Sequence, residues 1–175
     1  KDKLGGRSFA SGEIRLNRAF AYLVGKPNEG FKQMTDMINM SRLSNGVRAS
    51  GMMQRCFQES LFISNTRHAF NKKLIDLPLM QKQLLKILII TEASRSIVFK
   101  AADLLNKADK GDIFSQKIFR IITPLIKFRA CRDVRKVAGD AMEIRGGLGY
   151  IEDWLDPKIL RDSHLGSIWE GTSNI

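Results

Sequence analysis

The stretch DIFSQKIFRIITPLIKFRACRDVRKVAGDAMEIR, residues 112–145, decides the fold of this chain. Its apolar residues recur every three to four positions, which is the period of one face of an amphipathic helix. Asp112 opens this predicted helix, and Pro124 lies inside it, where the missing backbone donor predicts a kink one turn earlier. The apolar stripe comprises Phe114, Ile118, Ile121, Leu125, Phe128, Val134, Ala138 and Met142.

Two earlier segments carry the same period. One runs from Asn28 to about Arg67, and the other starts near Asp76 and Pro78 and ends at Gly111. Short loops between long helices predict antiparallel neighbours, and three wide apolar faces need a fourth helix. We therefore predict an all-α, antiparallel four-helix bundle whose final helix is missing from the sequence. The first stripe comprises Phe31, Met34, Ile38, Val47, Met52, Met53, Cys56, Phe57, Leu61 and Ile63, and the second comprises Met80, Leu84, Ile87, Thr91, Ser94, Val98, Ala101 and Leu105.

The N-terminal segment has a different pattern. Residues 10–25, ASGEIRLNRAFAYLVG, alternate loosely and stop at a turn cluster of Gly, Lys, Pro, Asn and Glu. This pattern predicts a short β-strand at the edge of a sheet whose other strands are absent. We expect residues 1–27 to be the end of a β domain and its linker, and residues 28–175 to form the helical bundle domain.

Composition limits the class of protein. The 175 residues are 43% hydrophobic and 27% charged, as in globular domains with one core. No apolar run approaches the roughly 20 residues of a membrane span, and the first residues do not resemble a secretion signal. Cys56 and Cys131 have no CxxC or histidine partner, so we expect packed, reduced thiols, no metal site and a cytoplasmic protein.

The net charge of +11 requires an anionic partner, a phosphorylated cofactor, or a well-solvated basic surface. Seven cations lie along the predicted third helix, against a single nearby acid, Asp133. They admit two interpretations: a solvated bundle face, or a surface that contacts the phosphates of duplex DNA. The seven are Lys117, Arg120, Lys127, Arg129, Arg132, Arg135 and Lys136.

The last helical stripe runs into RGGLGY, residues 145–150, and the chain closes on SIWEGTSNI, residues 167–175. The glycines end a helix instead of opening one, so they are not a dinucleotide-binding fingerprint of the Rossmann type. Glu170 stands between the indole of Trp169 and a run of small residues that begins at Gly171. A solvated surface acid does not need such neighbours, whereas an acid directed at a ligand does.

Taken in order, EIRGGLGYIED (143–153) and KILRDSHLGSIWEGTSN (158–174) resemble the C-terminal signature of the acyl-CoA dehydrogenase superfamily. Residues 3–34 are similar to the family's last β strands and the entry to its C-terminal bundle. TRHAFNKKLIDLPLM (66–80) resembles the loop after the first bundle helix, and its closest likeness is to the alkylation-response, AidB-like branch. The resemblance implies part of a longer protein, without its N-terminal helical domain, most of its β domain and its final helix.

The resemblance also implies an activity, that of an FAD-dependent oxidoreductase acting on the CH–CH group of an acyl-CoA in fatty acid metabolism. Glu170 matches the catalytic base, and Gly171, Asn39 and Arg42 match substrate-binding positions. Trp169 replaces a common tyrosine and narrows the space near the base, so we expect a short or branched acyl chain. The positions that match FAD contacts are Arg67, Ala69, Phe70, Gly146, Gly147, Trp169, Thr172, Ser173 and Asn174.

The family's partners are implied in the same way. They are an electron-transfer acceptor and further copies of the chain, in a homodimer or homotetramer, because the Arg67 loop reaches the FAD of a neighbouring subunit. The alternative is a DNA-binding flavoprotein of the alkylation-damage response with little dehydrogenase activity. The two hypotheses share the fold and the flavin, and they differ in what the basic face contacts.

Overall fold

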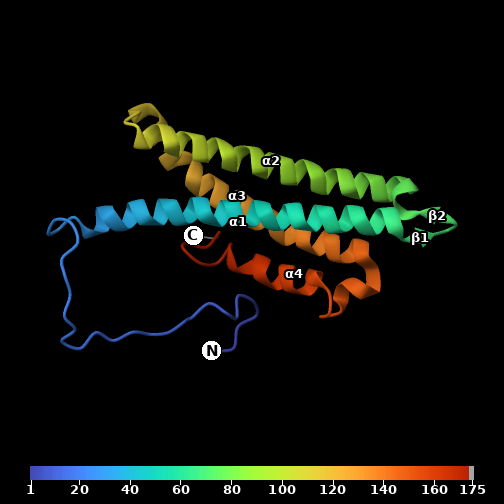
Figure 1. Cartoon of the computed structure of the whole chain (residues 1–175), viewed down its shortest axis with the longest axis horizontal. Helices are drawn as coiled ribbons and strands as arrows, with labels where there is room; N and C mark the ends of the chain where they lie inside the picture. The colour runs from blue at the N-terminus through green and yellow to red at the C-terminus, as the bar shows by residue number, and fades with distance from the viewer. Residues whose placement is uncertain (174–175) are drawn as a thin grey trace.

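Three long helices build the computed structural model, which describes residues 1–173. They are α1 (Gly30–Thr66), α2 (Pro78–Asp109) and α3 (Ile113–Arg145). Figure 1 shows them as a long, narrow bundle in which α4 (Leu155–Leu165) packs along the second half of α3. The remaining elements are the antiparallel strands β1 (His68–Ala69) and β2 (Lys72–Lys73) and the 3₁₀ turns η1 (Leu74–Asp76) and η2 (Gly146–Tyr150).

The helix boundaries predicted from the sequence are confirmed to within a few residues. Asp112 caps α3, because its Oδ1 accepts from the backbone N–H of Phe114 at 3.0 Å and its Oδ2 accepts from Ser115 Oγ at 2.6 Å. Gly146 ends α3 with a φ of +73°, a conformation that favours glycine. Helix α3 continues through Pro124 without interruption.

The β-strand predicted at the N-terminus is wrong for this structure. No strand occurs within residues 1–29, all of which the structure describes, and Ile14, Leu16 and Phe20 are exposed. A strand needs a neighbour to pair its backbone groups, and the segment has none here. The segment runs outside the bundle in Figure 1. Its first residues lie against α4, where the N–H of Gly6 donates to Asp162 Oδ1 at 2.7 Å.

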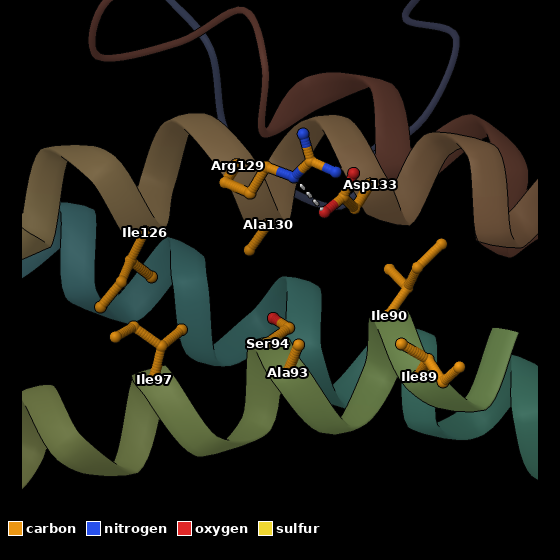
Figure 2. A pocket seen from close by; sticks show the side chains of 9 residues that line it. All are labelled: Ile89, Ile90, Ala93, Ser94, Ile97, Ile126, Arg129, Ala130 and Asp133. Atoms are coloured by element: carbon orange, nitrogen blue, oxygen red, sulfur yellow. Dashed lines mark hydrogen bonds and ion pairs between the residues drawn. The ribbon is translucent and has the colours of Figure 1, made fainter. Parts of the chain in front are cut away.

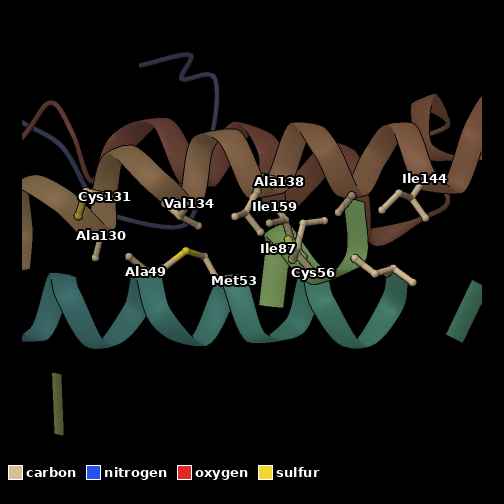
Figure 3. Packing of buried hydrophobic residues seen from close by; sticks show 13 residues of the cluster. Ala49, Met53, Cys56, Ile87, Ala130, Cys131, Val134, Ala138, Ile144 and Ile159 are labelled. Atoms are coloured by element: carbon tan, nitrogen blue, oxygen red, sulfur yellow. The ribbon is translucent and has the colours of Figure 1, made fainter. Parts of the chain in front are cut away.

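The main core lies where α1, α2, α3 and α4 meet (Figure 3). Met53 and Ile87 are completely buried there, and each such side chain contributes about 1.5–3 kcal/mol relative to exposure. Close packing depends on small residues: a Cβ on Gly46 would lie 2.3 Å from Ile126 Cγ2. Cys56 and Cys131 are free and buried, and burial raises the pKa of the Cys56 thiol to about 12.

The predicted apolar stripes are right in α2 and partly wrong in α1 and α3. In α2 the buried residues are those predicted from Leu84 to Ala101, and Leu104 is buried in place of Leu105, whereas Met80 is only partly buried. At the start of α1, Phe31 is 79% exposed, because this part of the helix extends beyond its neighbours (Figure 1). In α3 the stripe is correct at Val134 and Ala138, but Ile126 is buried where Leu125 was predicted. No helix in residues 1–173 has both the length and the apolar character that a bilayer crossing requires.

Candidate functional site

The loop that follows α4 presents Glu170 in an unusual backbone conformation. Glu170 has a φ of +54°, and Gly171 after it has a φ of +100°. A non-glycine residue in the left-handed region costs on the order of 1–3 kcal/mol and persists only when its surroundings hold it there. The neighbours of this loop therefore identify what holds Glu170 in place.

Two polar residues of α1 bind the Glu170 carboxylate. Ser41 Oγ donates to Oε1 at 2.5 Å, and Asn45 Nδ2 donates to Oε2 at 2.8 Å. Ser41 and Asn45 are one helical turn apart, so both face the same loop. The two donors therefore fix the positions of both carboxylate oxygens.

Asn45 also fixes the neighbouring indole. Its Oδ1 accepts from Trp169 Nε1 at 2.8 Å, and Asn45 itself is only 5% exposed. The Trp169 ring lies 5.1 Å from the guanidinium carbon of Arg48 and 6.2 Å from the ring of Phe9. A single buried amide therefore orients both the acid and the aromatic residue beside it.

A third group that holds this loop comes from α3. Lys127 Nζ donates to the backbone carbonyl of Trp169 at 2.7 Å and also to that of Gly171. Its side chain is 5% exposed, and burial lowers the pKa of the ammonium despite the opposing effects of Cys131 and Glu170. The sequence-based assignment of Lys127 to a basic surface face is therefore wrong.

Most predicted substrate residues and part of the predicted flavin set lie near this loop. Asn39 is buried, and its Oδ1 accepts at 3.4 Å from Nη1 of Arg42, the residue that follows Ser41 on α1. Arg42 also lies close enough to influence the charge of Lys127. Thr172 and Ser173 continue the loop, and Asn174 lies outside the described residues.

The other predicted flavin contacts gather at the opposite end of α1. Arg67 Nη1 donates to the carbonyl of Arg145 at 2.8 Å, and Gly146 allows this approach, since a Cβ there would lie 2.7 Å from that nitrogen. Arg67, Gly147 and Leu148 line a hollow of about 610 Å³ at this end of the bundle. Ala69 and Phe70 lie in and beside the β1–β2 hairpin, where Phe70 is 89% exposed.

Arg145 is itself anchored in the bundle. It pairs with Asp156 at 2.5 Å and with Glu59 at 2.7 Å, and its guanidinium lies over Trp154. The anchored backbone positions the guanidinium of Arg67, whose remaining N–H groups have no partner among residues 1–173. A free cation next to an exposed glycine backbone fits the diphosphate of a dinucleotide.

The two groups of candidate residues are far apart within one chain. Ser41 and Arg67 are separated along α1 by about 39 Å, at roughly 1.5 Å per residue. The structure therefore holds Trp169, Glu170 and Gly171 against α1 and Lys127, with Arg42 near Lys127 and Asn39 bonded to Arg42. It places Arg67, Gly146 and Gly147 elsewhere.

The predicted basic face of α3 is smaller than the sequence indicated. Lys127 is buried and does not belong to this face. Arg129 pairs with Asp133 at 2.7 Å, at the edge of an apolar hollow between α2 and α3 (Figure 2). Arg135 donates to Ser167 Oγ at 3.3 Å. Lys117, Arg120, Arg132 and Lys136 stay exposed, and no acidic residue within the described chain pairs with them.

Sequence reasoning missed Ser41, Asn45 and Lys127. One signal was available, because Thr123, Lys127, Ala130 and Val134 follow a helical stripe in which lysine is the exception. A lysine on a buried stripe indicates that its ammonium meets a defined acceptor. The partners of Ser41 and Asn45 lie more than a hundred residues away, beyond any local pattern.

Comparison with known proteins identifies the family of this fold. The family described as acyl-CoA dehydrogenase, C-terminal domain, matches residues 28–175. The putative acyl-CoA dehydrogenase AidB of Escherichia coli K12 is 33% identical over all of this chain and 32% of its own length. The chain spans about a third of the length of the curated relatives it matches.

Two solved structures share the fold. The apo form of Bd2924 superposes with a TM-score of 0.94 at 31% identity, over 99% of this chain and 35% of that one. Caenorhabditis elegans ACDH-11 in complex with C11-CoA gives a TM-score of 0.93 at 32% identity, over 99% of this chain and 30% of that one.

Proposed function

The chain belongs to the acyl-CoA dehydrogenase family, as its C-terminal domain, and we propose from this premise that it serves FAD-dependent α,β-dehydrogenation of an acyl-CoA with Glu170 as the base. The observation that carries this proposal is the Glu170 carboxylate, held by Ser41 and Asn45 on a strained loop. An acid built into such a position has a defined direction, which general-base catalysis requires.

In the proposed reaction, the acyl thioester loses one hydrogen from its α-carbon and one from its β-carbon. A Glu170 oxygen takes the α-proton of the thioester as that C–H bond breaks, the β-hydrogen leaves with its electron pair, and a carbon–carbon double bond forms. FAD, when bound, supplies the acceptor for that hydride. Asn39, Arg42 and Gly171 are proposed to position the thioester, since they lie on α1 and on the loop beside the base.

The cofactor is proposed to be shared between subunits of a homodimer or homotetramer. Trp169, Thr172 and Ser173 would touch it near Glu170, whereas Arg67, Ala69, Phe70, Gly146 and Gly147 would hold the diphosphate side of a neighbour's FAD. The wide separation of the two groups along α1 supports this division. Exposed Ile121, Leu125 and Phe128 on α3 offer apolar surface for such an assembly.

A short or branched acyl chain is the proposed substrate, because the Trp169 indole is fixed beside Glu170 by Asn45 and Arg48. Anaerobic addition of butyryl-CoA or isobutyryl-CoA to the flavin-loaded holoprotein should bleach the flavin and produce the enoyl-CoA. An eleven-carbon thioester, the length that ACDH-11 holds, is the comparison substrate and should react more slowly. Absence of bleaching with every acyl-CoA would reject the proposed activity.

A second candidate function is contact with duplex DNA, favoured by the exposed and unpaired Arg120, Arg132 and Lys136 on α3 and by the net charge of +11. Such binding should weaken steeply with salt, because each neutralised phosphate releases counterions. Arg132→Glu with Lys136→Glu should reduce the salt slope by up to about two phosphates, while Lys72→Glu in the hairpin should not. Binding indifferent to salt would exclude this candidate.

A further inference from the structure

Lys127 is the one lysine in the described chain whose side chain is buried, and it contacts the loop that carries Glu170. Lys127 lies in the middle of α3, one turn from Thr123 and one turn from Cys131, both of which are buried. Its stem is therefore held by packing, and its ammonium occupies a defined point in space. None of the ion pairs among residues 1–173 includes it, and its ammonium donates to two backbone carbonyls.

The two acceptor carbonyls bracket Glu170. The Trp169 carbonyl belongs to the peptide bond between Trp169 and Glu170. The Gly171 carbonyl belongs to the peptide bond between Gly171 and Thr172. Fixing the first peptide plane constrains the φ of Glu170, and fixing the second constrains the ψ of Gly171. Glu170 has a φ of +54°, in the left-handed region where an unsupported non-glycine residue would relax, whereas a glycine adopts the +100° of Gly171 without that penalty.

Lys127 and the α1 donors act on different parts of the same residue. Ser41 and Asn45 bind the carboxylate, whereas Lys127 binds the backbone on either side of it. The ammonium also lies near enough to Glu170, Arg42 and Cys131 for their charges to affect it. A charge-assisted bond to a carbonyl is roughly twice as strong as a neutral one, so a lysine suits this task better than an amide.

We infer that Lys127 is a positioning residue for the proposed reaction: its ammonium clamps the Trp169 and Gly171 carbonyls and so aims the Glu170 carboxylate at the substrate α-carbon. This inference rests on the proposed function of Glu170. It assigns Lys127 no contact with the substrate, and it predicts that loss of the clamp slows proton removal and leaves substrate binding almost unchanged.

The test compares Lys127→Met, which keeps the length of the stem and removes every donor, with Lys82→Met, an exposed position on α2. Backbone amide hydrogen exchange needs no cofactor, and it should accelerate at least about tenfold in residues 166–173 of Lys127→Met only. In the holoprotein, the rate constant for flavin reduction per bound flavin should fall about 10- to 100-fold, since small displacements of a reacting group have effects of this size. The acyl-CoA dissociation constant should change less than about threefold.

These readouts separate positioning from a general loss of structure. In a merely destabilised protein, backbone amide hydrogens would exchange faster throughout α1, α2 and α3. Such a protein would also lose bound flavin, but the flavin that stays bound would be reduced with the parent's rate constant. Lys127→Gln, which retains a neutral donor, serves if Lys127→Met does not fold, and it should show a smaller effect in the same direction. Parent-like loop exchange and a parent-like rate constant in a folded variant would overturn the inference.

Glu170→Gln distinguishes this inference from the proposed function beneath it. That variant should lose flavin reduction while residues 166–173 exchange as in the parent, because Lys127 still clamps the loop. If Glu170→Gln reduces flavin normally, the base assignment fails. If Glu170→Gln is inactive and Lys127→Met is fully active, only the positioning role fails.

Discussion

Asn45 donates its side-chain amide to the carboxylate of Glu170 at 2.8 Å, although the two residues are 125 positions apart in the chain. The same amide accepts from Trp169 Nε1, so it links α1 to the loop through two adjacent side chains. A buried amide with these partners specifies one loop conformation, because an alternative would leave a polar group without a partner.

Asn45→Ala should therefore damage both stability and activity. It removes a buried hydrogen bond to a charged group, which contributes about 1.5–3 kcal/mol, and leaves the indole N–H of Trp169 without its acceptor. We expect a lower thermal midpoint and a flavin-reduction rate reduced about tenfold or more, measured by stopped flow. Asn65→Ala is the matched control, since Asn65 is exposed on the same helix and its side chain bonds, among residues 1–173, only to the carbonyl of Leu61. Equal effects in the two variants would contradict the role of Asn45.

Arg67→Ala should weaken FAD retention and the assembly together. A charge-assisted contact to a diphosphate contributes about 1.5–3 kcal/mol, which corresponds to a loss of affinity of roughly 10- to 150-fold. Flavin content after gel filtration and the molecular mass in solution measure the two effects. Lys72→Ala, exposed in the adjacent hairpin, should alter neither. Normal flavin retention by a normal oligomer of Arg67→Ala would count against shared cofactor binding.

The contact between the N-terminal segment and α4 should depend on pH. Partial burial alone would raise the pKa of Asp162, but hydrogen bonds from Lys158 and from the Gly6 backbone lower it below its ordinary 3.8. A lowered folded pKa stabilises the folded state above pH 3.8, and this contribution is lost as the pH falls through the folded pKa.

Thermal unfolding between about pH 5 and about pH 2 tests this linkage. The midpoint of Asp162→Asn should fall less steeply with decreasing pH than that of the parent. Asp36→Asn, at an exposed position of α1, should retain the parent's slope. Identical slopes for the parent and Asp162→Asn would show that the carboxylate does not contribute.

Much of the fold was predictable because its determinants are local. Asp112, Pro78 and Gly146 act on the helix ends next to them, and the α2 stripe is apolar enough to reveal its buried face. The buried face of α1 was found only in part, since half of its buried residues are polar: Asn39, Asn45, Ser50, Ser60 and Ser64. Asn39 meets Arg42 and Asn45 meets the distant loop, whereas the buried hydroxyls of Ser60 and Ser64 have no hydrogen-bond partner among residues 1–173. A hydrophobic pattern registers neither case.

The candidate site divides in the same way. Glu170 stands out in the sequence through its neighbours, whereas the residues that hold it come from two other helices. Lys127 was predicted to lie on an exposed basic face, either solvated or in contact with DNA, because charge alone does not reveal burial. The packing of α3 against the loop shows its partners.

The central claim is that the Glu170 carboxylate removes the α-proton. Its most direct test is anaerobic flavin reduction by butyryl-CoA in Glu170→Gln, which keeps the size and hydrogen-bonding shape of the side chain and removes the base. We expect the flavin content and acyl-CoA binding of Glu170→Gln to stay close to those of the parent, and its flavin bleaching to be abolished. Bleaching of the Glu170→Gln holoprotein at the parent's rate would contradict the account.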